Sequence, residues 1–172
     1  MYIRKAKEAD METILSIYAR ARDFQKSTGN PNQWKDGYPQ RELLLEDLVQ
    51  GCLYVCIQET QGVHEIAAVF AYFTGEDATY RVIRNGAWLN DDPYGTVHRI
   101  AASGIAKGTA AFCFDWAFAQ CPNIRIDTHR DNVVMQNVLK KNGFIYCGEI
   151  TTHDGTPRMA YQKSDIKDAT GS

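Results

Sequence analysis

The sequence has no long apolar run and no large excess of charge of either sign. No stretch reaches the roughly 20 apolar residues that a membrane-spanning helix needs, and the opening MYIRKAKEAD lacks the hydrophobic segment of a signal peptide. Lys and Arg number 19 against 21 Asp and Glu, which gives a formal net charge of -2. This balance argues against bulk binding to nucleic acid or anionic membranes. We therefore expect a soluble, cytoplasmic protein.

Cysteine is present without a recognisable pattern. The chain has five cysteines, an odd number, and no CxxC pair: Cys52, Cys56, Cys113, Cys121 and Cys147. Each lies in an apolar context, where cysteine commonly serves as a small core residue. Neither a disulfide framework nor a zinc site is predicted, and no metal is expected. A lone catalytic thiol stays open, but no residue pattern points to one.

The order of predicted elements favours a mixed α/β protein. A chain of 172 residues suits one domain, which we expect to span 1–163, with a polar, frayed tail over 164–172. Hydrophobic periodicity and turn residues predict the order β-α-α-β-β-β-α-β-α-β-β. Helices are expected at 9–25, 41–51, 108–120 and 132–142, and strands at 1–6, 52–59, 65–74, 96–102, 123–129, 144–150 and 158–163. An early meander followed by β-α-β-α-β predicts a mixed sheet with helices on both faces.

The segment VHRIAASGIAKGTAAFCFDWAF passes from strand to helix through two glycines. A helix start leaves about four backbone N–H groups unpaired and carries a partial positive charge of roughly one half. Glycine lets a phosphate approach those groups closely. GIAKGTA, Gly104 to Ala110, therefore favours an anion cradle, with Lys107 as an added charge. Glycine-rich turns also occur without any ligand, and the segment matches neither a P-loop nor a dinucleotide-binding motif.

A second segment, DTHRDNVVMQNVLKKNGF, follows the next predicted strand. Together with IAKGTA, it resembles the GNAT superfamily of acyl-CoA-dependent N-acetyltransferases. The family pattern D-x-x-x-x-N-x-x-[AM]…G-F is matched by Asp127, Asn132, Met135, Gly143 and Phe144. The pattern [QR]-x-x-G-x-[GA] is matched at Gly108 and Ala110, while Ile105 replaces the usual Gln or Arg. The order of elements fits the family along nearly the whole chain.

The resemblance implies a mixed, mostly antiparallel sheet that is splayed at its centre. In this fold the pantetheine arm of acetyl-CoA pairs with exposed backbone of the splayed strand, here Ile100, Ala101 and Ala102. Asn132 would bond the same arm. The pyrophosphate would lie on the amides that open the following helix: Ile105, Ala106, Lys107, Gly108, Thr109 and Ala110.

The reaction implied is direct attack of an amine on the acetyl thioester, and it needs a base or a water chain because a primary ammonium has a pKa near ~10.4. His98, on the splayed strand, is the sharpest candidate, with an ordinary pKa near ~6.5. Alternation places it on the face shared with Ile100 and Ala102. The alternative is a buried, hydrogen-bonded core histidine. His129, Glu76 and Asp77 are weaker candidates. The family's usual general acid, a tyrosine seven residues after Asn132, is replaced by Leu139.

The loop between the first two helices covers the acceptor in this fold. Here it carries Gln33, Trp34 and Tyr38, which together with Tyr72 are candidates for the acceptor site; cation–π contact is one use for such aromatics. The alternative is that Trp34 and Tyr38 pin the loop to the core.

The function expected is acetyl transfer from acetyl-CoA to a primary amine of a small molecule or a peptide. A silent CoA-binding module of the same fold is the main alternative, and a nucleotide-binding or structural domain is a third. No nucleic-acid or membrane partner is expected. A homodimer is compatible with the resemblance, because dimers are common among similar proteins.

Overall fold

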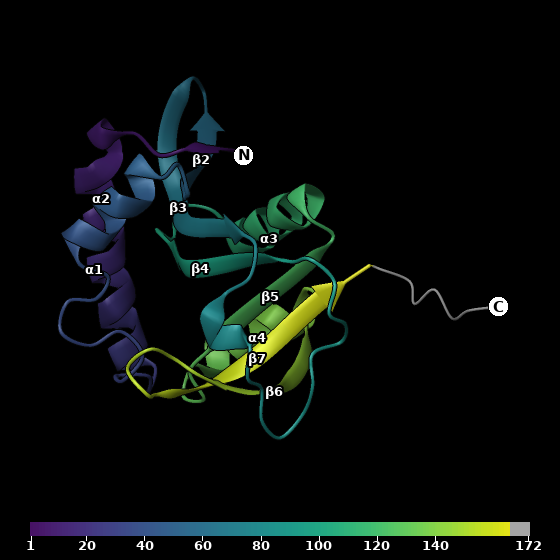
Figure 1. Ribbon diagram of the computed structural model, residues 1–172. Coiled ribbons are helices and arrows are strands. Elements are labelled where there is room, and N and C mark those ends of the chain that lie inside the picture. Colours follow the sequence, from purple (N-terminus) through teal and green to yellow (C-terminus); the bar gives the residue numbers. More distant parts are fainter. Residues whose placement is uncertain (166–172) are drawn as a thin grey trace.

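The computed structural model describes residues 1–165 as one seven-stranded sheet with helices on both faces (Figure 1). The strand order is β1-β2-β3-β4-β5-β7-β6, and β4–β5 is the parallel pair. The helices are α1 (Met11–Ser27), α2 (Arg41–Val49), α3 (Thr109–Gln120) and α4 (Val133–Lys141), with short 3-10 turns η1 (Glu8–Asp10) and η2 (Ala78–Tyr80). The strands are β1 (Tyr2–Lys5), β2 (Leu53–Thr60), β3 (Val63–Thr74), β4 (Gly95–Ala102), β5 (Asn123–Thr128), β6 (Ile145–Thr151) and β7 (Pro157–Ser164). The predicted element order and the mixed, splayed sheet are confirmed.

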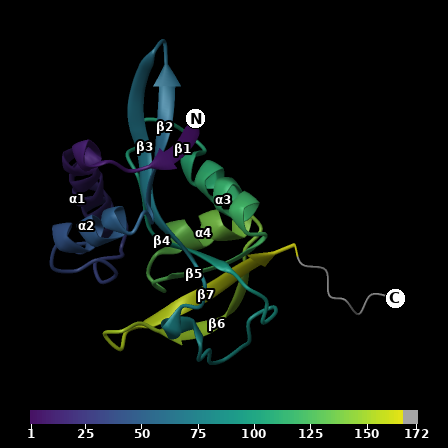
Figure 2. The ribbon, with the colours of Figure 1, turned by 45° about the horizontal axis from the view of Figure 1, so that its top comes forward.

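The sheet separates two apolar clusters, each covered by one pair of helices (Figure 2). Under α1 and α2, the fully buried Ile14, Tyr18 and Leu44 pack against Val69 of β3. On the opposite face, Phe114 of α3 packs with Phe70 and other side chains of the sheet. Strand alternation produces this division, because successive side chains of a central strand point to opposite faces. Both faces are apolar, so the central strands are held firmly in register.

Strands β4 and β5 are joined over a very short length. Gly95 pairs with Ile124 and Thr96 with Arg125, and beyond these two pairs the strands separate. The neighbouring pair β5–β7 runs over six residue pairs, from Asn123↔Ser164 to Thr128↔Met159. The splay therefore begins in the middle of the sheet, and it leaves the second half of β4 without a strand partner on one side.

A β-bulge at Arg99 changes which way β4 presents its side chains. His98 pairs with Ala71 and Ala101 with Val69, so two residues of β4 oppose one residue of β3. Arg99 has a φ of 55°, in the left-handed region that non-glycine residues rarely occupy. The Tyr18 hydroxyl donates to the Arg99 carbonyl oxygen at 2.7 Å and holds this conformation.

The bulge overturns the expectation that His98 shares a face with Ile100 and Ala102. That expectation assumed strict alternation, and the extra residue shifts the phase by one. His98 now lies on the α1 side, in phase with Ala101, which packs in the cluster under α1 and α2. Ile100 packs against the α3 cluster instead.

Polar side chains close the starts of two elements. Asn132 caps α4, its side-chain oxygen accepting the Met135 N–H at 3.0 Å. Asp10 precedes α1 without capping it: its carboxylate accepts from Arg4 at 2.7 Å and from the Lys7 N–H at 2.8 Å, and so closes η1. Cysteine contributes no disulfide, since all five thiols are free, and three of them are buried. Most of the tail expected to fray, 166–172, lies outside the described residues.

Candidate active site

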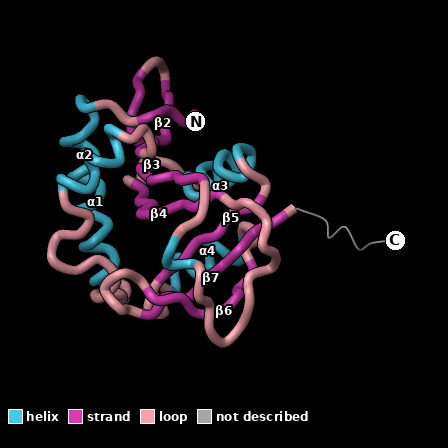
Figure 3. The backbone as a smooth tube through the Cα atoms, viewed as in Figure 1, coloured by secondary structure: helices cyan, strands magenta, loops and turns pink. Residues whose placement is uncertain are grey.

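A cavity of about 1000 Å³ opens where β4 and β5 separate. Its walls come from β4, the ends of β3 and β5, the 75–79 segment, α2, the start of α4, the 28–40 loop and the 152–156 turn. Figure 3 shows the last two as loop segments. The lining includes these polar side chains: Gln33, Lys35, Asp47, Asp77, His98, Arg99, Asp127, Thr128, Asn132, Asp154 and Arg158. No three His, Cys, Asp or Glu residues within 1–165 are placed to hold a metal ion.

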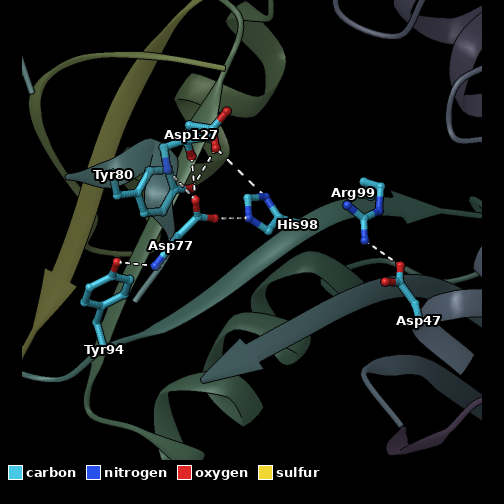
Figure 4. A network of polar contacts seen from close by, with 8 residues as sticks. Asp47, Asp77, Tyr80, Tyr94, His98, Arg99 and Asp127 are labelled. Carbon is cyan, nitrogen blue, oxygen red and sulfur yellow. Dashed lines mark hydrogen bonds and ion pairs between the residues drawn. The ribbon is translucent and has the colours of Figure 1, made fainter. Parts of the chain in front are cut away.

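His98 lies in this cavity between two carboxylates (Figure 4). Its Nε2 is 2.9 Å from Asp77 Oδ2, and its Nδ1 is 4.0 Å from Asp127 Oδ1. The Asp127 carboxylate also accepts a 2.6 Å hydrogen bond from the buried Tyr80 hydroxyl. Asp77 immediately precedes η2 and Asp127 lies on β5, so carboxylates from two separate segments reach the imidazole.

Asp77 is fixed by more than His98. Its Oδ1 accepts from the Thr79 N–H at 2.9 Å and from the Thr79 hydroxyl at 2.6 Å, and its own N–H donates to the Tyr94 hydroxyl oxygen at 2.7 Å. Burial acts to raise the Asp77 pKa, but the hydrogen bonds from His98 and Thr79 outweigh burial and lower the pKa below its ordinary value. Asp77 is therefore ionised at neutral pH and orients the imidazole.

A second ion pair stands on the other side of the bulge. Arg99 Nη2 lies 2.5 Å from Asp47 Oδ2, and both side chains are nearly buried. The Arg99 side chain extends away from the His98 cluster toward α2 (Figure 4). His98 pairs with Asp77, and the next residue, Arg99, pairs with Asp47. The bulge therefore sets the positions of both pairs.

The acceptor-loop candidates divide between the cavity and the core. Gln33, Trp34 and Tyr38 line the cavity, and Trp34 also packs edge-on against Tyr18 with ring centroids 5.6 Å apart. Trp34 thus faces the cavity and anchors its loop. Tyr72 is not at the cavity: it is buried on the α3 face, edge-on to Trp116 at 5.4 Å.

Asn132 lies on the cavity wall with both side-chain polar atoms engaged. Besides capping α4, it donates to Gln33 Oε1 at 2.8 Å, and Asn30 donates to the same oxygen at 2.9 Å. Asn132 therefore links the start of α4 to the 28–40 loop.

The glycine-rich segment before α3 has a largely unpaired backbone. Gly104 and Gly108 adopt φ values of 86° and 71°, and α3 begins at Thr109 as predicted. Within the described chain, the amides of residues 104–108 form no backbone hydrogen bond, and that of Ile105 reaches the Ser103 hydroxyl oxygen at 3.4 Å. Gly104, Ile105, Lys107 and Gly108 are exposed, Ala106 and Ala110 are half-buried, and Thr109 is buried. Of the residues expected along the splayed strand, Ile100 lines the cavity, Ala101 is buried and Ala102 is exposed.

Comparison with solved structures identifies the fold. An acetyltransferase of the GNAT family from Streptococcus agalactiae aligns with a TM-score of 0.84 at 35% sequence identity, covering 96% of both chains. The chain belongs to the GNAT family of acetyltransferases. A GNAT acetyltransferase from Listeria monocytogenes aligns at 0.65 with 20% identity, over 94% of this chain and 93% of that one. The NatC complex bound to Gag peptide and CoA aligns at 0.57 with 12% identity, over 96% and 98%. Scans of family models and of curated proteins find no match.

Sequence reasoning found some residues of this GNAT cavity and missed others. His98 and Asp77 were both considered, without the hydrogen bond that joins them. Asp127 stood out as a motif position. The Asp47–Arg99 pair has no local signal, because its members are 52 residues apart. His129 stays outside the cavity lining, and its Nδ1 accepts the Asp131 N–H at 3.0 Å in the turn before α4. Glu76 is exposed and pairs with Arg81.

This GNAT chain also departs from the family at Leu139, which is fully buried in the α3 cluster. A tyrosine at this position would have to displace packed side chains, because protein interiors have little free volume.

Among the helices of residues 1–165, none combines the length and the apolar character that a bilayer-spanning segment needs.

We expect Leu139→Tyr to lower the free energy of unfolding by about 1–3 kcal/mol, the usual cost of overpacking a core. The Leu139→Tyr substitution should not raise transferase activity, because the packing around position 139 has no room for the larger side chain. Urea denaturation measures the first effect and a thiol-release assay the second. Leu139→Met, which conserves volume, should cost under about 1.5 kcal/mol. A tyrosine variant as stable as the parent and faster in turnover would show that position 139 faces the site.

Proposed function

We propose that this protein transfers an acetyl group from acetyl-CoA to a primary amine by direct attack on the thioester. The observation that carries the proposal is the splay. The β4–β5 pairing stops after Thr96 and Arg125, and the His98–Asp77 pair stands in the cavity that the splay creates. The unpaired amides at 104–108 lie beyond the other end of β4. A long acyl carrier would thus meet an anion cradle at one end and a base at the other.

The backbone supplies the binding groups for the carrier. Amides at a helix start favour a diphosphate through hydrogen bonds and through the helix dipole. The second half of β4, from Ile100 onward, offers main-chain groups to an amide-containing arm in the way that an edge strand offers them to a peptide. Asn132 would join in this contact by exchanging its bond to Gln33. The substitution of Ile105 for Gln or Arg leaves the amide of that residue in place.

The His98–Asp77 pair supplies the base. With Nε2–H donating to Asp77, the Nδ1 lone pair faces the 4.0 Å space toward Asp127. An incoming ammonium beside this pair of atoms can donate one hydrogen bond to Nδ1 and one to that carboxylate, because both accept hydrogen bonds. Nδ1 then removes one ammonium proton, and the neutral amine attacks the carbonyl. The charge that develops on the carbonyl oxygen requires a fixed donor, for which the Ile100 amide is our candidate.

When the tetrahedral intermediate collapses, the C–S bond breaks, the nitrogen releases its second proton to water, and the thiolate departs without a tyrosine. Leu139 cannot donate a proton, and its burial removes that position from the site. A thiol pKa near ~8.5 makes an unassisted thiolate a tolerable leaving group. The same observation favours the second candidate function, a CoA-binding module that does not catalyse transfer.

Two measurements test the proposal. At about 100 times its Kd, a ligand that binds only the folded protein stabilises it by about 2.7 kcal/mol. Acetyl-CoA and CoA should therefore raise the melting temperature clearly, and ATP should not. Thiol release from acetyl-CoA, measured over a panel of small amines and peptides, should show turnover with some of them. Tight binding with no turnover would support the silent module. No stabilisation by acetyl-CoA would contradict both functions.

A further inference from the structure

Arg158, near the start of β7, is a buried cation on the cavity wall. It is 8% exposed and lines the same cavity as His98. Its Nη1 donates to the Pro157 carbonyl oxygen at 3.3 Å, and its Nη2 donates to the Gln33 carbonyl oxygen at 3.4 Å. Within residues 1–165, no carboxylate lies within 4.0 Å of this guanidinium. Its charge therefore has no direct counter-ion.

Such an arrangement is unusual for a buried charge. Removing a guanidinium from water costs free energy unless it is paired and its donors are used. A guanidinium has five N–H donors in a planar fork that matches a carboxylate. Arg99, in the same cavity, has a counter-ion in Asp47 at 2.5 Å. Arg158 has two long contacts to neutral oxygens, and so keeps most of its capacity for an anion.

Charges of both signs surround Arg158, but none of the carboxylates among them pairs with it. Lys35 lines the same cavity, and no ion-pair partner for it occurs in the described part of the chain. Burial lowers the pKa of His129, and the charges of Arg158, Arg130 and Lys35 lower it further. Hydrogen bonds from Thr152 and Thr156 lower the pKa of the exposed Asp154, and the charge of Arg158 contributes to the same shift.

The cavity thus offers two kinds of charged group at different places. Asp77 and Asp127 flank His98, whereas Arg158 is a buried cation elsewhere on the wall, and the nearby Lys35, Asp36 and Asp154 are exposed. Asp127 pairs with Ala160, and Arg158 is two residues along β7 on the same face. Two residues of a strand span about 7 Å, so the backbone positions of Asp127 and Arg158 are offset along the strand direction by about the length of a small molecule.

We propose that the acceptor is a small molecule carrying both a primary amine and a carboxylate, such as a free amino acid, with Arg158 binding the carboxylate. This inference rests on the proposed function and specifies its substrate. The amine then lies between His98 and Asp127, and the carboxylate meets the guanidinium fork bidentately. An amine without a carboxylate would leave Arg158 buried without a counter-ion, and this sets the expected preference.

Matched acceptors test this assignment. For several amino acids, the free acid, its C-terminal amide and the corresponding decarboxylated amine are compared in the thiol-release assay. With the parent protein we expect the free acid to have a kcat/KM about 10-fold or more above the amide. Arg158→Gln should raise KM for the free acids by about 10- to 100-fold and change KM for the amides less than twofold. Arg158→Lys should restore part of the loss, since an ammonium keeps the charge without the fork.

Arg130→Gln is the matched control. Arg130 is exposed, acts on His129 as Arg158 does, and does not line the cavity. Its replacement therefore removes a nearby positive charge without removing a contact to the acceptor. A binding readout accompanies the kinetics: with CoA present, the free acid should raise the melting temperature of the parent protein but not of Arg158→Gln. If Arg158→Gln does not fold, Arg158→Lys must still show a raised acid-to-amide ratio of KM values.

The outcomes separate the two proposals. If the parent protein prefers the amide or the simple amine, the carboxylate assignment is wrong and acetyl transfer stands. An equal loss for all three acceptors in Arg158→Gln would likewise overturn the assignment, since it would indicate a structural role. If no acceptor is acetylated and acetyl-CoA does not stabilise the protein, the proposed function itself fails.

Discussion

Replacing His98 by glutamine is expected to lower kcat for amine acetylation by about 100-fold or more, within the range that a positioned general base contributes. Among the described residues, His98 is the imidazole held in the cavity by a carboxylate, through its 2.9 Å bond to Asp77. Glutamine can still donate to Asp77 but cannot accept the ammonium proton. Steady-state kinetics with the best acceptor of the panel, over a range of pH, measures the effect.

Two other histidines serve as controls for this substitution. His129 is buried in the turn before α4, outside the cavity lining, and His153 is an exposed residue at the cavity rim. Glutamine at either position should change kcat less than threefold, as expected for groups without contact to the reacting amine. Asp77→Asn should lower kcat as well, because the neutral amide cannot stabilise the imidazolium and its NH2 group, facing Nε2, would favour the other tautomer. If His98→Gln keeps the parent kcat and pH profile, His98 is not the base, and Asp127 becomes the group to test.

Replacing Asp47 by asparagine is expected to lower the free energy of unfolding by about 3–5 kcal/mol, the typical cost of leaving a buried charge without its partner. The Asp47 side chain is 5% exposed and that of Arg99 is 11% exposed. Arg99 cannot easily move its guanidinium to water, because its backbone is fixed in the bulge and its carbonyl accepts from Tyr18. Urea denaturation, followed by circular dichroism, provides the measurement.

The exposed pair Glu12–Arg41 is the control for this stability prediction. Its side chains are 82% and 50% exposed, and its N–O distance is 2.9 Å. Glu12→Gln should change the free energy of unfolding by less than about 1 kcal/mol, because water and salt screen such pairs. If Glu12→Gln and Asp47→Asn change the free energy of unfolding equally, the buried pair contributes no more to stability than the exposed one, and the prediction is wrong.

The sequence predicts the parts of the fold that depend on local rules. Glycine at 143 ends α4 with a φ of 86°, and Asn132 starts it with a side-chain cap. The hairpin between β2 and β3 turns through Gln61 and Gly62, both at positive φ, between two runs of strand-forming residues. These signals act within a few residues, and their order along the chain matches one known family.

The site depends on contacts that local rules cannot reach. Nothing in VHRIAAS marks Arg99 for a positive φ, a position usually given to Gly, Asn or Asp. The bulge follows from the register with β3 and from the Tyr18 hydroxyl, 81 residues away in sequence. The bulge moves His98 to the opposite face from Ile100 and Ala102, and the prediction that these three residues share a face is therefore wrong. Arg158 meets Gln33 across 125 residues and carries no motif.

The short β4–β5 contact also divides the sheet mechanically. Four strands lie on one side of this seam and three on the other, and two residue pairs hold the seam together. Any relative displacement of the two portions changes the width of the cavity directly, because the cavity begins where the pairing stops. Access for a reactant is thus set where strand pairing is shortest, while the apolar cluster under α3 contains side chains from β3, β4, β5 and β7 and so joins the two portions across the seam.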